Sequence, residues 1–405
     1  MNAKMKMKKE FQGIEGGLFS TVEKADISGD YQAMAEQGID LMGWADPFTP
    51  DFSLPKHVEQ ASHDALKGPL AAHYTAPIGN ETLKQLIASK IKKQNHIDID
   101  WKRNLIITPG SDSGLYYAML PFIERGDEVM VPVPCYPNNL QNISTMGGTP
   151  IYIPLKEENN FELEIDEFEK RVSDKTKMVI LTHPNNPTTT VFSPASLKQL
   201  SEFIIKHDLI LVCDQAFEDF IYDDKEMITP ASLPGMWERT LTVFSVSKGM
   251  GFSGYRVGYI MACDQIMDVL FGAAVSVVGA THTLSQLAMI EAFKDPSFMN
   301  EFEEAFDARR KYAYEAINAI PNVSMLMPES GFLCWINVSK LGTGQEIYHY
   351  LLKHAKVAIN DGAVYGEGGK DHIRVVLGVY RDSNKVYNAI DRIQKALMNH
   401  PNQKQ

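Results

Sequence analysis

Cysteine is scarce in this 405-residue chain and widely scattered. The four cysteines are Cys135, Cys213, Cys263 and Cys334, and no two of them form a C-x-x-C pair. Disulfide frameworks and cysteine-based metal sites need closely spaced or numerous cysteines, so the sequence predicts neither, and we expect no metal site. Scattered thiols of this kind are typical of a reducing compartment, and we therefore expect a cytoplasmic protein.

Long apolar runs are also absent from the sequence. No run approaches the roughly 20 residues that a membrane-spanning helix needs, so we expect no membrane association. Lys4, Lys6, Lys8 and Lys9 make the first residues basic, as in a signal peptide, but residues 10–15, with the sequence EFQGIE, follow where an apolar segment is required. We expect a flexible arm there and no secretion signal. No internal repeat or low-complexity linker is evident.

Basic residues are also fewer than acidic residues in this chain. Lysine and arginine total 39 against 51 aspartates and glutamates, which gives a formal net charge of -12. Nucleic-acid binding requires a basic surface to meet the phosphate backbone, so the charge excludes nucleic acid as an expected partner. With 44% hydrophobic residues, the chain is long enough for a large core and indicates one large and one smaller domain.

The most informative stretch is residues 244–258, which follows an apolar run that predicts a buried strand. Lys248 leaves this strand end, where desolvation favours a neutral amine that can form a Schiff base with an aldehyde. Ser245, Ser247 and Arg256 offer donors for a phosphate, and the glycines allow close backbone approach. Pyridoxal phosphate carries both an aldehyde and a phosphate, so this order of residues suits it as a cofactor.

Two other interpretations of the stretch stay open on these residues alone. Residues 249–254 satisfy the G-x-G-x-x-G dinucleotide pattern, which needs a helix next, whereas residues 256–262 predict another strand. The stretch is also compatible with a glycine-rich turn that carries a solvated lysine.

Ser245-x-Ser-Lys248 with Arg256 eight residues after the lysine resembles the cofactor segment of the fold-type I pyridoxal phosphate enzymes, in the class I and II aminotransferase branch. The resemblance runs from about Gly43 to Arg374. It implies an α/β fold with a mostly parallel, seven-stranded type of sheet between helices and a smaller α+β domain. We expect an N-terminal arm at 1–45 that belongs to the small domain, a large cofactor-binding domain at 46–290, and a small domain at 291–405.

Further motifs carry cofactor-binding roles over from this family. Pro109 to Gly114 predicts a helix start whose free amides, at Ser111 and Asp112, suit a phosphate. Tyr136 follows a predicted strand and resembles the aromatic residue that stacks on the pyridine ring. Tyr74 resembles the tyrosine that reaches the phosphate of the neighbouring subunit, which implies a homodimer with shared active sites.

The pyridine ring and the substrate have their own expected partners. Asp214 ends an apolar strand 34 residues before Lys248, and a buried carboxylate there needs a cation such as the ring nitrogen. Asn186 matches the asparagine that donates to the phenolate oxygen beside the substrate. Arg374 lies in an apolar strand and matches the arginine that grips the substrate carboxylate.

The loop that lies over the substrate in the family is matched only loosely. Gly43 and Trp44 begin the corresponding segment, and we expect both to shape the substrate pocket. A packing role is an alternative for Trp44.

Departures from the family pattern bear on the reaction. Phe217 stands where a tyrosine usually donates a second hydrogen bond to the phenolate oxygen, and Thr189 replaces a usual glycine. Asp112 occupies a position where some aspartate-using members have lysine. An aspartate there repels a distal carboxylate and attracts a cation, although it also suits the first turn of a helix.

The sequence therefore predicts a pyridoxal phosphate-dependent aminotransferase that moves an amino group from a neutral or cationic L-amino acid to a 2-oxo acid. Lys248 is expected to be both anchor and general acid/base. A racemase, lyase or oxidase of amino acids with the same fold is the alternative within enzymes. A cofactor-binding sensory domain is the alternative outside them, which the acidic charge disfavours.

Overall fold

The computed structural model describes residues 7–9, 33–51 and 54–404. Its largest element is a seven-stranded sheet with the strand order β2-β8-β7-β6-β5-β3-β4. The five strands from β7 to β4 pair in parallel, and β8 pairs antiparallel with both of its neighbours. The expected α/β fold with a mostly parallel sheet is therefore confirmed. The strands are β2 (Leu105–Thr108), β3 (Glu128–Val133), β4 (Thr149–Pro154), β5 (Thr176–Thr182), β6 (Ile210–Asp214), β7 (Thr240–Ser245) and β8 (Gly258–Met261).

Helices cover both faces of this sheet, which explains why the central strands are apolar along their whole length. In β6, Val212 packs with one group of helices, whereas Leu211 and Cys213 point to the opposite face. The first face carries α5 (Ser111–Met119), α6 (Pro137–Met146) and α9 (Asp264–Val277). The other face carries α4 (Glu81–Gln94), α7 (Ile165–Glu169), α8 (Pro194–Lys206) and α10 (Thr283–Lys294), with α3 (Lys56–Lys67) packed on α10.

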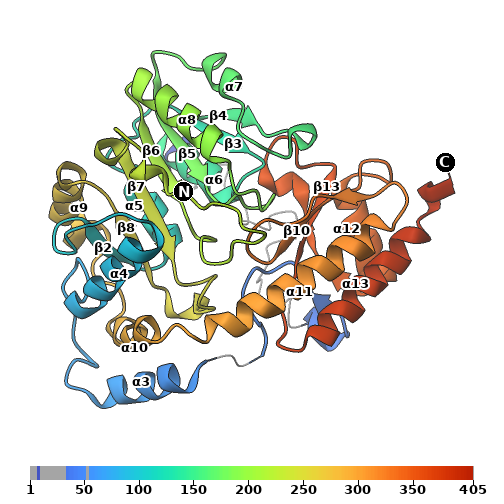
Figure 1. The fold of residues 1–405 in the computed structure, drawn as a ribbon, viewed down its shortest axis with the longest axis horizontal. Helices are drawn as coiled ribbons and strands as arrows, with labels where there is room; N and C mark the ends of the chain where they lie inside the picture. The colour runs from blue at the N-terminus through green and yellow to red at the C-terminus, as the bar shows by residue number, and fades with distance from the viewer. Residues whose placement is uncertain (1–6, 10–32, 52–53, 405) are drawn as a thin grey trace.

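A second, antiparallel sheet of four strands lies beside the first, in the order β12-β13-β10-β9. The long helix α11 (Met299–Asn318) runs from the region of α10 to the second sheet and lies along α13 there (Figure 1). Strand β1 (Asp40–Leu41) pairs in parallel with β11 (Val357–Ala358), which brings the residues before Gly43 to this part of the molecule. The other elements here are β9 (Ser324–Met325), β10 (Leu333–Asn337), α12 (Gly344–His354), β12 (Asn360–Asp361), β13 (His372–Val376) and α13 (Ser383–Met398).

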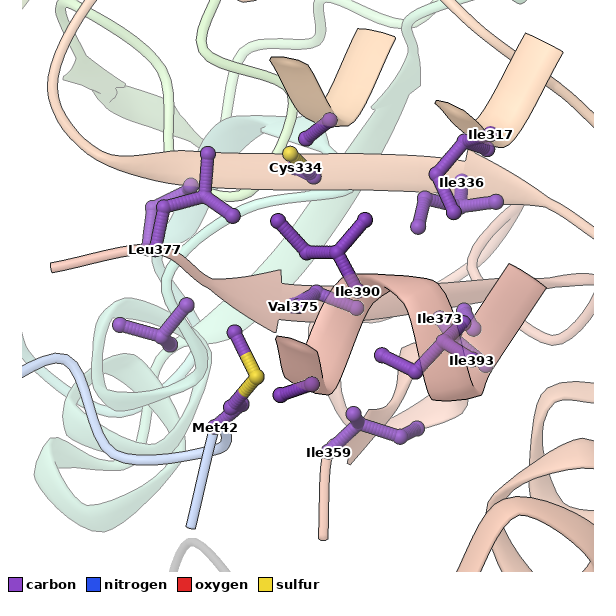
Figure 2. Packing of buried hydrophobic residues seen from close by; sticks show 14 of the residues in the cluster. Met42, Ile317, Cys334, Ile336, Ile359, Ile373, Val375, Leu377, Ile390 and Ile393 are labelled. Atoms are coloured by element: carbon purple, nitrogen blue, oxygen red, sulfur yellow. The ribbon is translucent and has the colours of Figure 1, made fainter. Parts of the chain in front are cut away.

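An aliphatic core joins these elements. Figure 2 shows Ile390 and Ile393 of α13 packed toward Val375 and Ile373 of β13, with Met42 at one end of the cluster. The period of the apolar residues in α13 matches one face of a helix, and that face is the buried one.

Three expectations need comment. The strand expected at 256–262 begins only at Gly258, because Arg256 has a left-handed φ of 52° after a short 3-10 turn. The helix expected to start between Pro109 and Gly114 begins at Ser111 and ends at Met119. The domain limits 1–45, 46–290 and 291–405 stay a prediction, and most of the expected N-terminal arm lies outside the described residues. In the described part of the chain, no helix is both long and apolar enough to cross a membrane.

Replacing Ile390 with alanine tests the importance of the aliphatic core. Ile390 is 1% exposed, so I390A is expected to lower the free energy of unfolding by about 2–5 kcal/mol through lost burial and a residual cavity. Urea denaturation followed by circular dichroism measures this change. K395A on the exposed face of the same helix is the control, and equal midpoints for the two variants would contradict the assignment of the core.

Candidate active site

A cavity of about 430 Å³ lies where the parallel strands of the large sheet end, and Arg374 of the second sheet also lines it. Such strand ends are where open α/β sheets bind ligands, because loops and helix N-termini converge there. Eleven of the sequence-predicted residues line it: Gly43, Trp44, Ser111, Asp112, Tyr136, Asn186, Asp214, Ser247, Lys248, Arg256 and Arg374.

Two predicted residues do not line the cavity. Ser245 is buried behind it, where its hydroxyl oxygen accepts a hydrogen bond from the backbone N–H of Ser247 at 3.1 Å. Tyr74 is 92% exposed on the surface of the molecule. Its role in a neighbouring subunit therefore stays a prediction.

Other lining residues were not singled out from the sequence. Asp46 follows Trp44 in the same loop and accepts a hydrogen bond from the Ser253 hydroxyl at 2.5 Å. Asn138 and Thr182 also line the cavity. Asn138 comes two residues after Tyr136, at the start of α6. Its closeness to Tyr136 in the sequence could have identified it as a lining residue. The sequence around Asp46 gave no sign of a role in the cavity, because a Pro- and Asp-rich loop is ordinarily only a connection.

Lys248 projects into the cavity from the turn after β7. Its Nζ donates to the carbonyl oxygen of Ala45 at 2.5 Å and lies 6.0 Å from the centroid of the Phe217 ring. Desolvation lowers the pKa of Lys248 to about 8, although the negative charge of Asp46 opposes this shift. At pH 7 about a tenth of this lysine is thus a neutral amine, the form that a nucleophile or proton acceptor requires.

Asp214 is 3% exposed at the end of β6 and has no cationic partner at ion-pair distance among the described residues. Among the described residues, its carboxylate accepts one hydrogen bond, from the backbone N–H of Ala216 at 3.2 Å. Desolvation raises the pKa of Asp214 to about 7, because little in the protein compensates the buried charge. The carboxylate therefore suits a cationic group of a ligand, which would lower this pKa again.

Donors for an anion gather at the N-terminus of α5. Gly110 precedes this helix with a φ of 83°, and a side chain there would meet the Arg256 guanidinium at 2.3 Å. Ser111, Ser247 and Arg256 face the cavity together, and the half-exposed Arg256 is not committed to a close ion pair, since Asp112 lies 3.8 Å away. Hydroxyls, helix amides and a guanidinium are the donor set that a phosphate prefers.

Asp112 accepts hydrogen bonds from two neutral side chains, Tyr136 and Asn138. The Tyr136 hydroxyl donates to its Oδ1 at 2.9 Å, and the Asn138 amide donates to the same oxygen at 3.1 Å. Burial and the neighbouring carboxylate together raise the pKa of Tyr136 well above its usual range. Asp112 thus adds a negative charge to the cavity wall, and its ring neighbour Tyr136 stays protonated.

Arg374 is 4% exposed on β13 and has no carboxylate partner among the described residues. Its guanidinium donates to Asn360 Oδ1 at 2.8 Å, to Asn186 Oδ1 at 3.0 Å and to the Gly43 carbonyl at 3.1 Å. These neutral acceptors fix the orientation of the guanidinium and leave its charge uncompensated. A substrate carboxylate is the ligand that such a group accommodates.

The donor set as a whole fits pyridoxal phosphate. The cavity offers an amine for the aldehyde at Lys248, an anion cradle near Arg256, and an uncompensated carboxylate at Asp214 for a protonated ring nitrogen. Phe217 also lines the cavity, and its apolar ring supplies no hydrogen-bond donor there.

Comparison with protein families gives a match over most of the chain. Residues 42–393 match the family described as aminotransferase class I and II. Among curated proteins, an aspartate aminotransferase of Pyrococcus abyssi is 32% identical over 352 residues, which cover 86% of this chain and 90% of the relative. The aromatic-amino-acid aminotransferase 2 of Thermococcus litoralis is 30% identical over 369 residues, which cover 90% and 93%.

Solved structures show the same similarity. The aromatic aminotransferase from Pyrococcus horikoshii superposes with a TM-score of 0.84 at 30% identity, over 90% of this chain and 98% of the other. The fold of this chain is thus that of a solved aminotransferase structure.

Replacing Asp214 with asparagine tests whether its carboxylate is buried without compensation. Between pH 3.8 and about 7, Asp214 binds more proton in the folded than in the unfolded wild type, so its contribution to the free energy of unfolding falls as pH rises. In cofactor-free protein, D214N is expected to lack this fall and to be more stable than wild type by up to about 4 kcal/mol at pH 8, at about 1.4 kcal/mol per pKa unit.

Urea denaturation of the two proteins at pH 5, 6, 7 and 8 measures this difference. The exposed-site variant D98N is the control and should follow the wild-type pH dependence. Parallel curves for D214N and wild type would show that the pKa of Asp214 is not raised in the folded protein.

Proposed function

Since the chain belongs to the aminotransferase class I and II family, we propose that its cavity binds pyridoxal 5'-phosphate through Lys248 and that the named residues act on the substrate there. The protein is an aminotransferase, which moves an amino group between an amino acid and a 2-oxo acid. The proposal rests mainly on one observation. Lys248, Asp214, Arg256 and Arg374 meet in a single cavity, and within residues 33–51 and 54–404 neither Asp214 nor Arg374 has an ion-pair partner.

Bound in this cavity, the cofactor supplies an aldehyde for covalent attachment of the substrate amine and a ring that withdraws electrons from the α carbon. Ser111, Ser247 and Arg256 hold its phosphate, with the buried Ser245 fixing the Ser247 backbone. The amides at Ser111 and Asp112 add donors at the start of α5. Asp214 supplies the counter-charge for the ring nitrogen.

Tyr136 and Asn186 orient the ring, Tyr136 by contact with its face and Asn186 through its side-chain amide. The Oδ1 of Asn186 accepts from Arg374, which leaves the amide N–H groups of Asn186 to donate to the cofactor. Lys248 receives and returns the α proton at Nζ, for which a pKa of about 8 is well matched near neutral pH.

The substrate carboxylate binds Arg374, beneath a loop that begins at Gly43 and Trp44. We propose that the donor is a neutral or cationic amino acid. Asp46 and Asp112 both place negative charge on the cavity wall, where a second substrate carboxylate would be repelled. The two relatives are named for aspartate and for aromatic amino acids, so relatedness alone leaves the donor open.

We further propose a homodimer in which Tyr74 completes the partner's phosphate site. A tyrosine that is 92% exposed in one chain supports a role outside that chain. The four free, buried cysteines support a reducing, cytoplasmic setting.

A half-reaction identifies the donor. Single L-amino acids are added to the cofactor-loaded protein without acceptor, and released oxo acid is quantified together with oxygen uptake and the stereochemistry of the remaining amino acid. We expect one oxo acid per site from a neutral or cationic donor and a rate for aspartate at least about tenfold lower. K248A should release none, and D112N should lose about tenfold of any preference for a cationic over a neutral donor.

Rapid single-turnover reaction with aspartate would contradict the donor proposal. Racemised or decarboxylated amino acid, formed without conversion of the cofactor to its amine form, would instead indicate the racemase or lyase alternative. Oxygen uptake with more than one oxo acid per site would indicate the oxidase alternative.

Hybrid dimers test the position of Tyr74. K248A and Y74F chains with different tags are co-expressed, and the hybrid is purified. If Tyr74 acts in the partner's site, the hybrid contains one intact site and should recover about half of the wild-type activity. If it acts within its own chain, no intact site exists and only the residual Y74F activity remains. Y152F, which changes another surface tyrosine, serves as the control in place of Y74F and should be fully active as a homodimer.

A further inference from the structure

Thr189 occupies a strained backbone position three residues after Asn186. Its φ is 65°, in the left-handed region that β-branched residues strongly disfavour. The residue is 4% exposed, so solvent does not relieve the strain. A conformation of this kind persists only where surrounding contacts hold it.

Local hydrogen bonds close the loop but do not explain its position. The Thr189 N–H donates to the Asn185 carbonyl at 2.8 Å, and the Asn185 N–H donates to the Thr190 carbonyl at 2.9 Å. The Asn185 side chain donates to the Pro134 carbonyl at 3.1 Å, which fixes the start of the loop against the large sheet.

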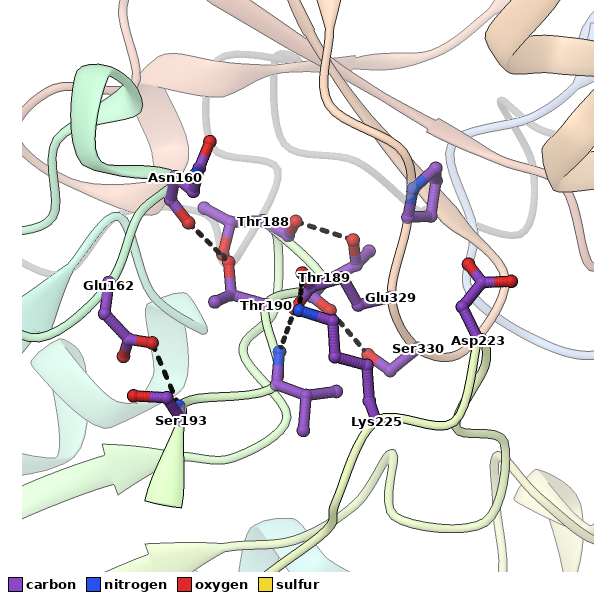
Figure 3. A network of polar contacts seen from close by, with 12 residues as sticks. Asn160, Glu162, Thr188, Thr189, Thr190, Ser193, Asp223, Lys225, Glu329 and Ser330 are labelled. Carbon is purple, nitrogen blue, oxygen red and sulfur yellow. Dashed lines mark hydrogen bonds and ion pairs between the residues drawn. The ribbon is translucent and has the colours of Figure 1, made fainter. Parts of the chain in front are cut away.

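The outer side of the loop is held by a turn before β10, here named the 329–331 turn. The Ser330 hydroxyl donates to the Thr189 carbonyl at 2.9 Å, and Glu329 accepts from the Val191 N–H at 2.9 Å (Figure 3). Lys225 forms an ion pair with Glu329 at 2.6 Å. Ser330 is 1% exposed, so its hydrogen bond is made away from competing water.

The same turn also packs against Phe217, which lines the cavity. The Gly331 N–H donates to the Phe220 carbonyl at 2.9 Å, and the Tyr222 hydroxyl donates to the Gly331 carbonyl at 2.7 Å. Gly331 has a φ of 62°, and a side chain there would meet the Phe217 ring at 2.7 Å. The 329–331 turn therefore contacts both the loop of Asn186 and the ring of Phe217.

We propose that Ser330 and Glu329 are positioning residues, which hold the strained Thr189 loop so that Asn186 stays in contact with Arg374. The Asn186 Oδ1 accepts from the Arg374 guanidinium at 3.0 Å, so a displaced loop changes the orientation of the carboxylate-binding group. The inference rests on the proposed function, because it assigns a geometric support to the proposed carboxylate and cofactor contacts. Neither Ser330 nor Glu329 lines the cavity.

Carboxylate binding to the cofactor-loaded protein tests the proposal. Propionate, which lacks the amino group, is titrated while the visible absorbance of the cofactor is recorded, and the pH midpoint of that absorbance is measured separately. S330A leaves the buried Thr189 carbonyl without its donor, so the propionate Kd is expected to rise about tenfold. The absorbance midpoint should move to higher pH, because the Asn186 donor is displaced. S330T keeps the hydroxyl and should restore both values.

A double-mutant cycle separates positioning from general damage. Glycine adopts a positive φ without strain, so in T189G the loop keeps its shape with less need of Ser330. T189G alone should bind propionate within about twofold of wild type, and S330A in the T189G background should raise the Kd less than about threefold. Loss of a merely structural hydrogen bond would give the same tenfold change in both backgrounds.

Lys225 and Lys206 form a matched pair of variants. Both lysines make ion pairs with a glutamate, Lys225 with Glu329 at 2.6 Å and Lys206 with Glu169 at 2.8 Å, but only the first pair touches the loop of Asn186. K225M should raise the propionate Kd about threefold, and K206M should leave it unchanged.

A propionate Kd in S330A equal to that of wild type, or additive effects of S330A and T189G on this Kd, would overturn the inference. The proposed function would still stand in that case if the visible absorbance shows that the cofactor is bound. Failure of the wild type to bind the cofactor at all would overturn the proposed function and the inference with it.

Discussion

The cavity depends on two charges of opposite sign that the protein buries without compensating them. Asp214 and Arg374 are 3% and 4% exposed, and neither has an oppositely charged partner at ion-pair distance among the described residues. Burial of an unpaired charge costs several kcal/mol, which the rest of the fold must offset. The large, doubly covered sheet provides that stability, and both charges become favourable only when a ligand of matching charge enters.

The two opposite charges lie on different sheets. Asp214 and Lys248 lie at the ends of parallel strands of the large sheet, whereas Arg374 lies within an antiparallel strand of the small one. Contacts between the two parts therefore set the distance between cofactor and substrate groups. Asn186, Gly43 and Asn360 accept hydrogen bonds from Arg374, and Ser330 of the 329–331 turn donates to Thr189 in the loop that carries Asn186.

The sequence allowed much of this to be predicted, for a physical reason. Motif residues at Lys248, Asp214 and Asn186 directly follow apolar runs, and the ends of parallel strands meet at one edge, so local patterns sufficed to bring them together. Contacts between distant segments could not be predicted in this way. Lys248 Nζ meets the Ala45 carbonyl from 203 residues along the chain, and no local pattern records that contact.

The same limit applies to Asp46 and to the 329–331 turn. Asp46 lies in a loop whose composition indicates only a connection, and its charge matters because the fold places it near Lys248. Ser330 is an ordinary serine in the sequence, and its importance comes from the strained Thr189 carbonyl 141 residues earlier. Thr189 was noted only as a departure from a glycine, whereas its φ of 65° gives that departure a structural cost.

The hydrogen bond between Arg374 and the Gly43 carbonyl joins residues that are 331 positions apart. During synthesis, the seven-stranded sheet can be complete once β8 has left the ribosome, but the substrate-binding half of the cavity must wait for β13. Arg374 is the last of the cavity-lining residues in the sequence, so the wall that it forms is complete only when the polypeptide is nearly finished.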